Sequence, residues 1–220
     1  MHPRLETMLQ CYPALAACIE DIQSSIALLE TTFRAGGKLL VCGNGGSAAD
    51  CEHIAGELMK GFHLPRPLPH WTRRALLEAF PADGAYLAKQ LQGALPVISL
   101  ANASSLGTAI VNDIAADMLF AQQVYGYGKP GDALLAISTS GTSRNVLRAL
   151  QVGKVMGLHC IGLGGCNARE ALQPFCDVAI STPATVAADV QEQHLPVYHA
   201  ICAILEETFF PMASSSRPAE

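Results

Sequence analysis

The sequence has few charged and few aromatic residues for its length. Of its 220 residues, 15% are charged and 6% are aromatic, whereas 50% are hydrophobic. A chain of this length fits a single domain. So little charge on a small protein favours apolar surface that is covered by further copies of the chain, and we therefore expect a homo-oligomer.

Clustered positive charge and long apolar runs are also lacking. The formal net charge is -5, which argues against nucleic acid or anionic membrane as partners, because both attract clustered Lys and Arg. No apolar run reaches the length of about 18 residues that spans a membrane. The opening stretch MHPRLETMLQ lacks the order of a signal peptide. The sequence therefore predicts a cytoplasmic protein.

The cysteines show no CxxC pair and no other metal-type spacing. Several of them lie in apolar runs such as LLVCGN and AICAIL. We therefore predict buried free thiols rather than disulfides or a thiolate metal site. The eight are Cys11, Cys18, Cys42, Cys51, Cys160, Cys166, Cys176 and Cys202.

Short apolar runs alternate with helical patterns along most of the chain. Strands that are apolar throughout need burial on both faces, as in a parallel sheet between helices. The sequence therefore predicts an α/β fold, a three-layer α/β/α sandwich with a five-stranded parallel sheet after an N-terminal helical segment. The expected strands are residues 38–42, 96–101, 133–139, 160–163 and 177–181.

One domain is expected to span residues 1–212. Residues 65–95 interrupt the alternation with several prolines and two short helical stretches, around 75–80 and 85–91. We predict that this insertion flanks the site or an interface. The polar residues 213–220 are expected to form a disordered tail.

Two expected strands end in loops of small and hydroxyl-bearing residues, each followed by a helix. Residues 43–47 read GNGGS, and residues 138–143 read STSGTS. The carboxyl ends of parallel strands share one edge of the sheet, and free N–H groups at a helix N-terminus bind anions. Either loop alone is more often a tight turn or a helix cap. Together they predict a phosphate pocket that contains no Lys or Arg.

Gly43, Gly45 and Ala48 also satisfy the dinucleotide pattern G-x-G-x-x-A, but only weakly. That pattern expects an acidic residue about 20 residues further on, where this sequence has Phe62-His63-Leu64-Pro65. The Gly-Lys-Ser/Thr of a nucleotide-triphosphate loop is lacking as well. We therefore expect no nucleotide cofactor.

Two pairs of polar residues have spacings that suit a shared pocket. His53 and Glu57 lie four residues apart on one helix face. Gln191 and His199 lie about 80° apart on an expected helix at 189–210. Imidazole, carboxylate and amide donors suit a zinc-like ion, although each pair alone is more often structural.

The motifs CGNGGSAADCEHIAGEL, ISTSGTSRNV and VQEQHLPVYH resemble those of the SIS (sugar isomerase) family, and within it the phosphoheptose isomerases. The resemblance covers nearly the whole chain outside the insertion and implies the flavodoxin-like SIS fold. It implies aldose–ketose isomerisation of sedoheptulose 7-phosphate to D-glycero-D-manno-heptose 7-phosphate through an enediol. It also implies a homotetramer in which helices of neighbouring subunits complete each site.

The resemblance assigns roles to individual residues. Glu57 and His199 would be the catalytic acid/base pair, with the division of roles left open. One zinc ion per site would be held by His53, Glu57, Gln191 and His199. The residues implied to contact the phosphosugar are Asn44, Gly45, Gly46, Ser47, Asn112, Asp113, Ser138, Thr139, Ser140, Ser143 and Gln191.

The sequence also departs from the family pattern. Pro196, between Gln191 and His199, removes a helix hydrogen bond and predicts a kink. Asp189 stands one position nearer to Gln191 than the family's acidic residue, and Lys60 matches an expected basic residue only loosely. A non-catalytic alternative stays open, a phosphosugar-binding or DnaA initiator-associating (DiaA-like) protein, because the stretch ILEETFFP resembles that relative. Glu57 and His199 favour the enzyme.

Overall fold

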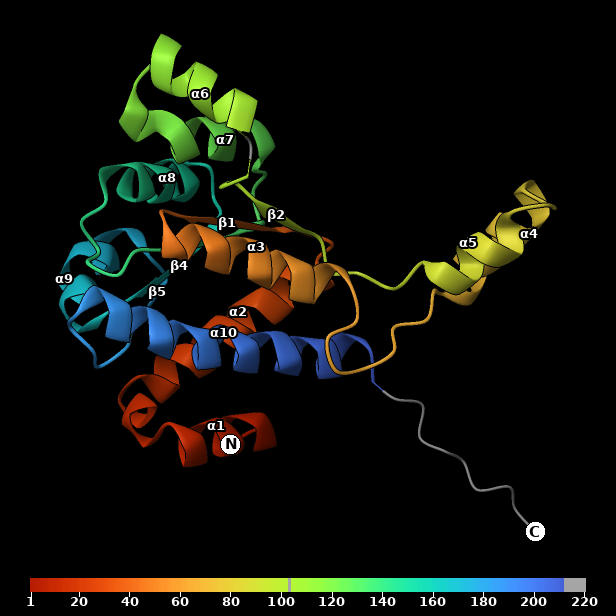
Figure 1. Cartoon of the computed structure of the whole chain (residues 1–220), viewed down its shortest axis with the longest axis horizontal. Coiled ribbons are helices and arrows are strands. Elements are labelled where there is room, and N and C mark those ends of the chain that lie inside the picture. The colour runs from red at the N-terminus through yellow and green to blue at the C-terminus, as the bar shows by residue number, and fades with distance from the viewer. Residues whose placement is uncertain (103, 212–220) are drawn as a thin grey trace.

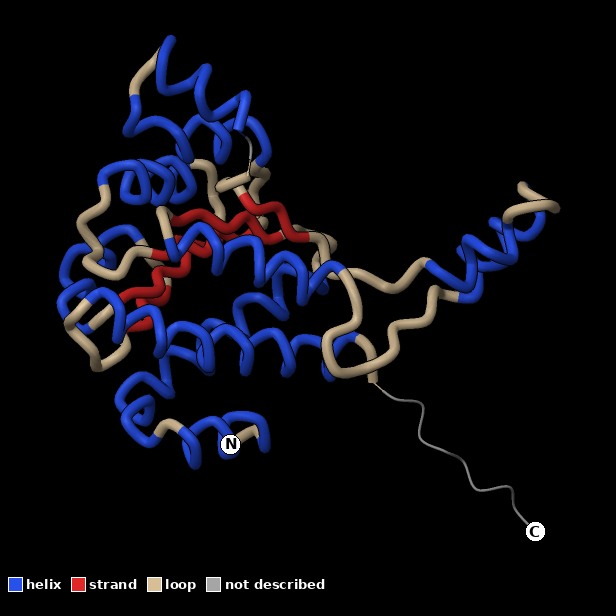
Figure 2. The backbone as a smooth tube through the Cα atoms, in the orientation of Figure 1, coloured by secondary structure: helices blue, strands red, loops and turns tan. Residues whose placement is uncertain are grey.

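A five-stranded, all-parallel sheet forms the centre of the molecule (Figures 1 and 2). The computed structural model describes residues 1–102 and 104–211, so the predicted tail at 213–220 lies outside the described residues. The strand order is β2-β1-β3-β4-β5, with every neighbouring pair parallel. The predicted sheet is therefore confirmed. Its strands are β1 (Leu39–Gly43), β2 (Val97–Ser99), β3 (Ala133–Ile137), β4 (His159–Gly164) and β5 (Val178–Ser181).

Helices cover both faces of this sheet, which confirms the three-layer sandwich (Figure 1). Along β1, Leu39 and Val41 enter one core cluster and Leu40 and Cys42 enter the other, because successive side chains of a strand alternate between faces. The first layer contains α1 (Pro3–Cys11), α2 (Ile19–Arg34), α3 (Gly46–Met59) and α10 (Ala187–Phe209). The second contains α6 (Ser104–Asp113), α7 (Leu119–Tyr127), α8 (Arg144–Val155) and α9 (Arg169–Leu172).

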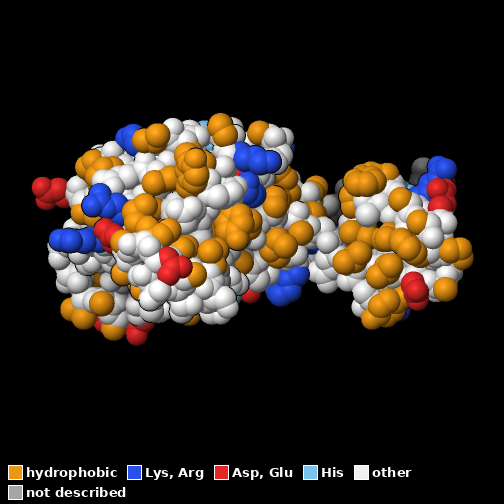
Figure 3. Space-filling view, turned by 90° about the horizontal axis from the view of Figure 1, so that it is seen from above, with side chains coloured by type: hydrophobic (Ala, Val, Ile, Leu, Met, Phe, Trp, Pro, Cys, Tyr) orange, Lys and Arg blue, Asp and Glu red, His pale blue; other side chains and the backbone are white. Residues whose placement is uncertain are grey.

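The predicted insertion contains a helical hairpin that projects from the body of the molecule (Figure 1). It consists of α4 (His70–Ala79) and α5 (Gly84–Gln90), and α4 has no buried residue. Gly84 permits the close approach of the two helices, because a Cβ there would collide with the Leu76 carbonyl oxygen. Hydrophobic side chains cover much of the visible face of the hairpin (Figure 3), and Trp71 is 74% exposed.

Helix α10 continues through Pro196 as one helix. Proline removes one backbone hydrogen bond, but the helix is held by packing of its buried face against α1, α2 and α3. Gln191 and His199 therefore lie on a single helical element. Among the described residues, no helix has both the length and the apolar character needed to cross a membrane.

All eight cysteines are free thiols, and five of them are buried. Burial raises the pKa of Cys18 to about 11 and that of Cys160 to about 12, so these thiols stay protonated near neutral pH. The prediction of buried free thiols is confirmed for the five, whereas Cys11 and Cys166 are exposed and Cys176 is half-buried.

The buried imidazole of His194, on α10, makes the fold sensitive to acid. Burial lowers the pKa of His194 to about 4, whereas an unfolded histidine titrates near 6.5. Between these values the unfolded chain binds a proton that the folded chain does not, so stability falls as the pH falls, by up to about 3 kcal/mol. We expect urea denaturation at pH 7 and pH 5 to show a smaller loss for His194→Leu than for the wild type. Equal losses would place the acid sensitivity elsewhere.

Candidate functional site

Two loops meet at the carboxyl edge of the sheet. The first connects β1 to α3, the second connects β3 to α8, and their parent strands are neighbours with Gly43 paired to Ile137. Each loop contains a glycine with a positive φ, +56° at Gly45 and +72° at Gly141, a conformation that other residues rarely adopt. The predicted pairing of the two anion-binding turns is thus present in the structure.

A reciprocal pair of amides joins the two loops. Asn44 donates from Nδ2 to Asn145 Oδ1 over 2.9 Å, and Asn145 donates from Nδ2 to Asn44 Oδ1 over 2.8 Å. Each hydrogen bond reinforces the geometry of the other, so the pair fixes the spacing of the loops. Asn145 was not among the predicted site residues. It lies in the motif ISTSGTSRNV, but only its contact with a residue 101 positions away marks it out.

The hydroxyl groups of the second loop divide into two kinds. Ser138 is buried, accepts the N–H of Gly141 over 3.1 Å, and lies 3.2 Å from the Ser143 hydroxyl. Ser140 is exposed, and its hydroxyl lies 2.9 Å from that of Thr142. Ser138 therefore shapes the loop, whereas Ser140, Thr142 and Ser143 leave hydroxyls accessible to a ligand.

Two further predicted residues have anchoring contacts rather than open hydroxyls. The carbonyl of Thr139 accepts the N–H of Gly165 over 3.1 Å, which ties the second loop to the end of β4. Ser47 is buried in the first turn of α3, and its carbonyl accepts the thiol of Cys51. These contacts hold both loops against the sheet.

Helix α10 touches the first loop through Gln191. A Cβ at Gly46 would come within 2.6 Å of the Gln191 Nε2 atom, so only glycine permits this approach. The predicted residues Gly46 and Gln191 therefore lie side by side, at the N-terminus of α3.

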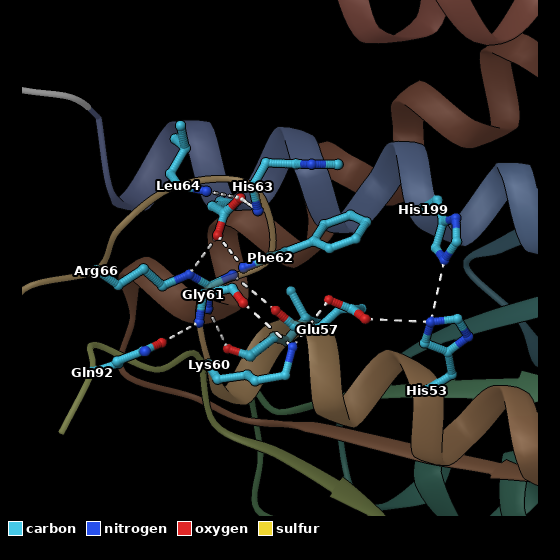
Figure 4. A network of polar contacts seen from close by, with 12 residues as sticks. His53, Glu57, Lys60, Gly61, Phe62, His63, Leu64, Arg66, Gln92 and His199 are labelled. Carbon is cyan, nitrogen blue, oxygen red and sulfur yellow. Dashed lines mark hydrogen bonds and ion pairs between the residues drawn. The ribbon is translucent and has the colours of Figure 1, made fainter. Parts of the chain in front are cut away.

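A second group of polar side chains lies further along α3 and α10 (Figure 4). His53 Nε2 lies 3.3 Å from Glu57 Oε1 and 3.4 Å from His199 Nε2. The Tyr198 hydroxyl lies 3.0 Å from His53 Nδ1 and donates to Asp50 Oδ1 over 3.2 Å. The structure thus brings together three predicted residues, His53, Glu57 and His199, and adds two that the sequence gave no reason to select.

The surroundings of these groups shift their protonation in consistent directions. Burial, followed by the nearby His53, lowers the pKa of His199, so its imidazole is neutral at physiological pH. Burial raises the pKa of Asp50 and that of Tyr198, whose hydroxyl is also disfavoured as an anion by the Asp50 charge. The Glu57 side chain is only 13% exposed and lies 3.5 Å from Lys60 Nζ.

The predicted zinc ligands match the ion in type and, in part, in spacing. A tetrahedral zinc ion with bonds of about 2.0 to 2.1 Å spaces its ligand atoms by roughly 3.4 Å, close to the separations of His53 from Glu57 and from His199. Gln191, however, lies against Gly46. In the part of the chain that the structure describes, no group of three or more His, Cys, Asp or Glu side chains is assembled to hold a metal. The donor types fit, but the four-ligand set is not assembled.

Asn112 and Asp113 lie apart from the other predicted residues. They end α6 on the opposite face of the sheet from α3 and α10 (Figure 1), and Asn112 donates to Asp113 over 2.7 Å. No hydrogen bond between described residues joins them to either loop or to the His53 group. A single chain therefore does not bring this pair into the site.

A groove between α1 and α10 borders the His53 group. Its lining includes Tyr12, Leu195 and His199, and Tyr12 and Leu195 are exposed. The edge of the site formed by His199 is therefore open and partly apolar in a single chain.

Comparison with known proteins followed from these observations. A family model described as the SIS domain matches residues 11–76 and 75–165. The phosphoheptose isomerase of Maridesulfovibrio salexigens is 37% identical, over 97% of this chain and 90% of that protein. That of Synechocystis sp. is 38% identical, over 88% and 86%. The solved structure of phosphoheptose isomerase GmhA from Neisseria gonorrhoeae superposes with a TM-score of 0.71 at 28% identity, over 92% of this chain and 95% of that one.

Proposed function

This chain belongs to the phosphoheptose isomerase family of SIS-domain proteins, and we propose that it converts sedoheptulose 7-phosphate to D-glycero-D-manno-heptose 7-phosphate. The observation that carries the proposal is the meeting of Glu57 and His199 around His53, on the helix whose N-terminus forms the first loop. The reaction moves a proton without net oxidation, so it needs no nucleotide cofactor. A DiaA-like role without catalysis is not favoured, because the site holds acid/base groups and the matched relatives are isomerases.

The phosphate group of the substrate would lie between the two loops. The N-termini of α3 and α8 both point to this edge, and their free N–H groups favour an anion. The hydroxyls of Ser140 and Ser143 would add neutral donors. The Asn44–Asn145 pair supports this assignment, because it holds the two loops at a fixed separation.

Glu57 and His199 would move the protons at the other end of the substrate. The Glu57 carboxylate would remove the proton from the carbon next to the carbonyl, and the same proton would return to the neighbouring carbon. The neutral imidazole of His199 would exchange a proton with the substrate oxygens, so that the intermediate is an enediol. The lowered pKa of His199 supports this role, because a neutral ring can both accept and donate a proton.

We include one zinc ion per site in the proposal. His53, Glu57 and His199 have suitable donor atoms, and Gln191 would join them by leaving its contact with Gly46. A bound zinc ion would polarise the carbonyl and stabilise negative charge on its oxygen.

We also propose a homotetramer in which neighbouring copies complete each site. The open groove beside His199 and the distance of Asn112 and Asp113 from the rest of the site support this assembly. The cytoplasmic location stays a prediction.

Direct assay of the purified protein tests the proposed function. Sedoheptulose 7-phosphate and shorter ketose phosphates would be incubated with the protein, with and without a chelator, and the products separated by chromatography. We expect conversion of the seven-carbon ketose, loss of the rate with chelator, and recovery on addition of zinc. Binding of the sugar phosphate without conversion under any of these conditions would support the non-catalytic alternative.

A further inference from the structure

Arg66 and Glu206 form an ion pair whose two side chains are both 0% exposed. Arg66 Nε donates to Glu206 Oε1 over 2.8 Å, and the pair joins the first leg of the hairpin to α10. Desolvation offsets most of the attraction within a buried pair, so such a pair is weak support for stability alone. Its role is better sought in what the two side chains hold.

The Glu206 carboxylate holds the segment that follows α3. Its Oε1 accepts the N–H of Phe62 over 2.7 Å, and its Oε2 accepts those of His63 over 2.7 Å and Leu64 over 3.1 Å. Burial by itself raises the pKa of this carboxyl, but these N–H groups and Arg66 hold the pKa below its ordinary value. Glu206 is therefore an anion that fixes three consecutive backbone positions.

The Arg66 guanidinium holds the end of α3 (Figure 4). It donates from Nη1 to the carbonyl of Leu58 over 2.7 Å, and from Nη2 to the carbonyl of Glu57 over 2.8 Å. The last carbonyls of a helix have no partner within the helix, so Arg66 fixes the backbone of the residue proposed as the base.

Both partners are also linked to His199. Glu206 follows His199 by two turns on α10, which places the two side chains on one face of the helix. The Phe62 ring, whose N–H is held by Glu206, lies 5.4 Å from the His199 ring between centroids. One charge pair therefore determines the placement of Glu57 through α3 and contacts the neighbourhood of His199 through Phe62.

The hairpin closes on the same point. The N–H of Gly93, on the returning leg, donates to the carbonyl of Arg66 over 2.7 Å, and that of Gly61 donates to Gln92 Oε1 over 2.6 Å. Both legs of the projecting helices are thus fastened beside the pair. Displacement of the hairpin is resisted there before it reaches α3.

We propose that Arg66 and Glu206 are positioning residues, which hold α3 and α10 at the separation that lets Glu57 and His199 act on one substrate. The inference rests on the proposed isomerase function, and neither side chain touches the substrate. Misplacement of reacting groups by about 1 Å lowers rates by up to about 100-fold. Loss of the pair is therefore expected to act on kcat more than on KM, because the loops that hold the phosphate are elsewhere.

Glu206→Gln tests this role, with Asp132→Asn as the matched control. Asp132 is a buried carboxylate that likewise pairs with a cation, Lys38, and accepts backbone N–H groups, but it lies at the opposite edge of the sheet. We expect Glu206→Gln to lower kcat by about 10- to 100-fold with KM changed less than about threefold. Asp132→Asn should lower the unfolding midpoint but leave kcat unchanged.

A second variant and a second readout complete the test. Arg66→Lys keeps the charge but lacks the planar group that reaches two carbonyls, so it should reproduce the kcat loss if Glu206→Gln does not fold. In protein labelled with 13C-histidine, the His199 ring signal, assigned with His199→Gln, should shift in Arg66→Lys and Glu206→Gln but not in Asp132→Asn. A wild-type kcat or an unshifted His199 signal in the folded clamp variants would overturn the inference. Absence of turnover in the wild type would count against the proposed function instead, and the ring signal would then decide the positioning role.

Discussion

Replacing Glu57 by glutamine is expected to lower kcat for the proposed isomerisation by about 10²- to 10⁴-fold, the usual contribution of a general base. Glutamine has nearly the same shape as glutamate but cannot take up a proton at neutral pH. The phosphate would still be held between the loops of residues 43–47 and 138–143, so KM should change little. The measurement is initial rate against substrate concentration, with circular dichroism to confirm the fold.

Glu52→Gln is the matched control for this substitution. Glu52 is exposed on the same helix, α3, and it makes the same chemical change at a position outside the His53 group. It should leave both kcat and KM at wild-type values. Turnover by Glu57→Gln at the rate of Glu52→Gln would remove Glu57 from the mechanism.

The fold was predictable because its elements are encoded in local patterns. Runs such as residues 38–42 and 133–139 are apolar throughout, and two-sided burial in a parallel sheet is the physical reason. The pair His53 and Glu57 was equally accessible, since helical spacing alone places both on one face. The link from this pair to His199 came from family resemblance, and the structure confirms only their proximity.

Other parts of the site depend on contacts that no local pattern encodes. Asn145 matters because it meets Asn44, and Arg66 because it meets Glu206 from 140 residues away. Each such residue is ordinary in its own segment, an asparagine in the first turn of a helix or an arginine between prolines. Its role arises from the tertiary fold, so periodicity and spacing could not select it.

Replacing Ser140 and Ser143 together by alanine is expected to weaken the binding of sugar phosphate. Neither loop contains Lys or Arg, so the anion depends on N–H groups, helix dipoles and hydroxyls. A hydrogen bond to a charged group contributes about 1.5 to 3 kcal/mol. Loss of two should therefore lower kcat/KM by a factor on the order of 10² or more, mainly through KM.

The fold should tolerate this double substitution. Ser143 precedes α8, but its side chain makes no capping hydrogen bond, and the Ser140 hydroxyl is exposed. Ser138 is left unchanged because its hydroxyl accepts the N–H of Gly141 and shapes the loop. The unfolding midpoint should consequently stay close to that of the wild type.

Ser24→Ala gives the reference for removing a hydroxyl far from the loops, since Ser24 is exposed on α2 and bonds only to the carbonyl of Glu20 within the described contacts. Steady-state kinetics and calorimetric titration with the ketose phosphate would be compared for the two variants. Because the phosphate is common to substrate and product, the double variant should lose affinity for both. If it bound them as tightly as Ser24→Ala does, the phosphate would have to lie somewhere other than between these loops.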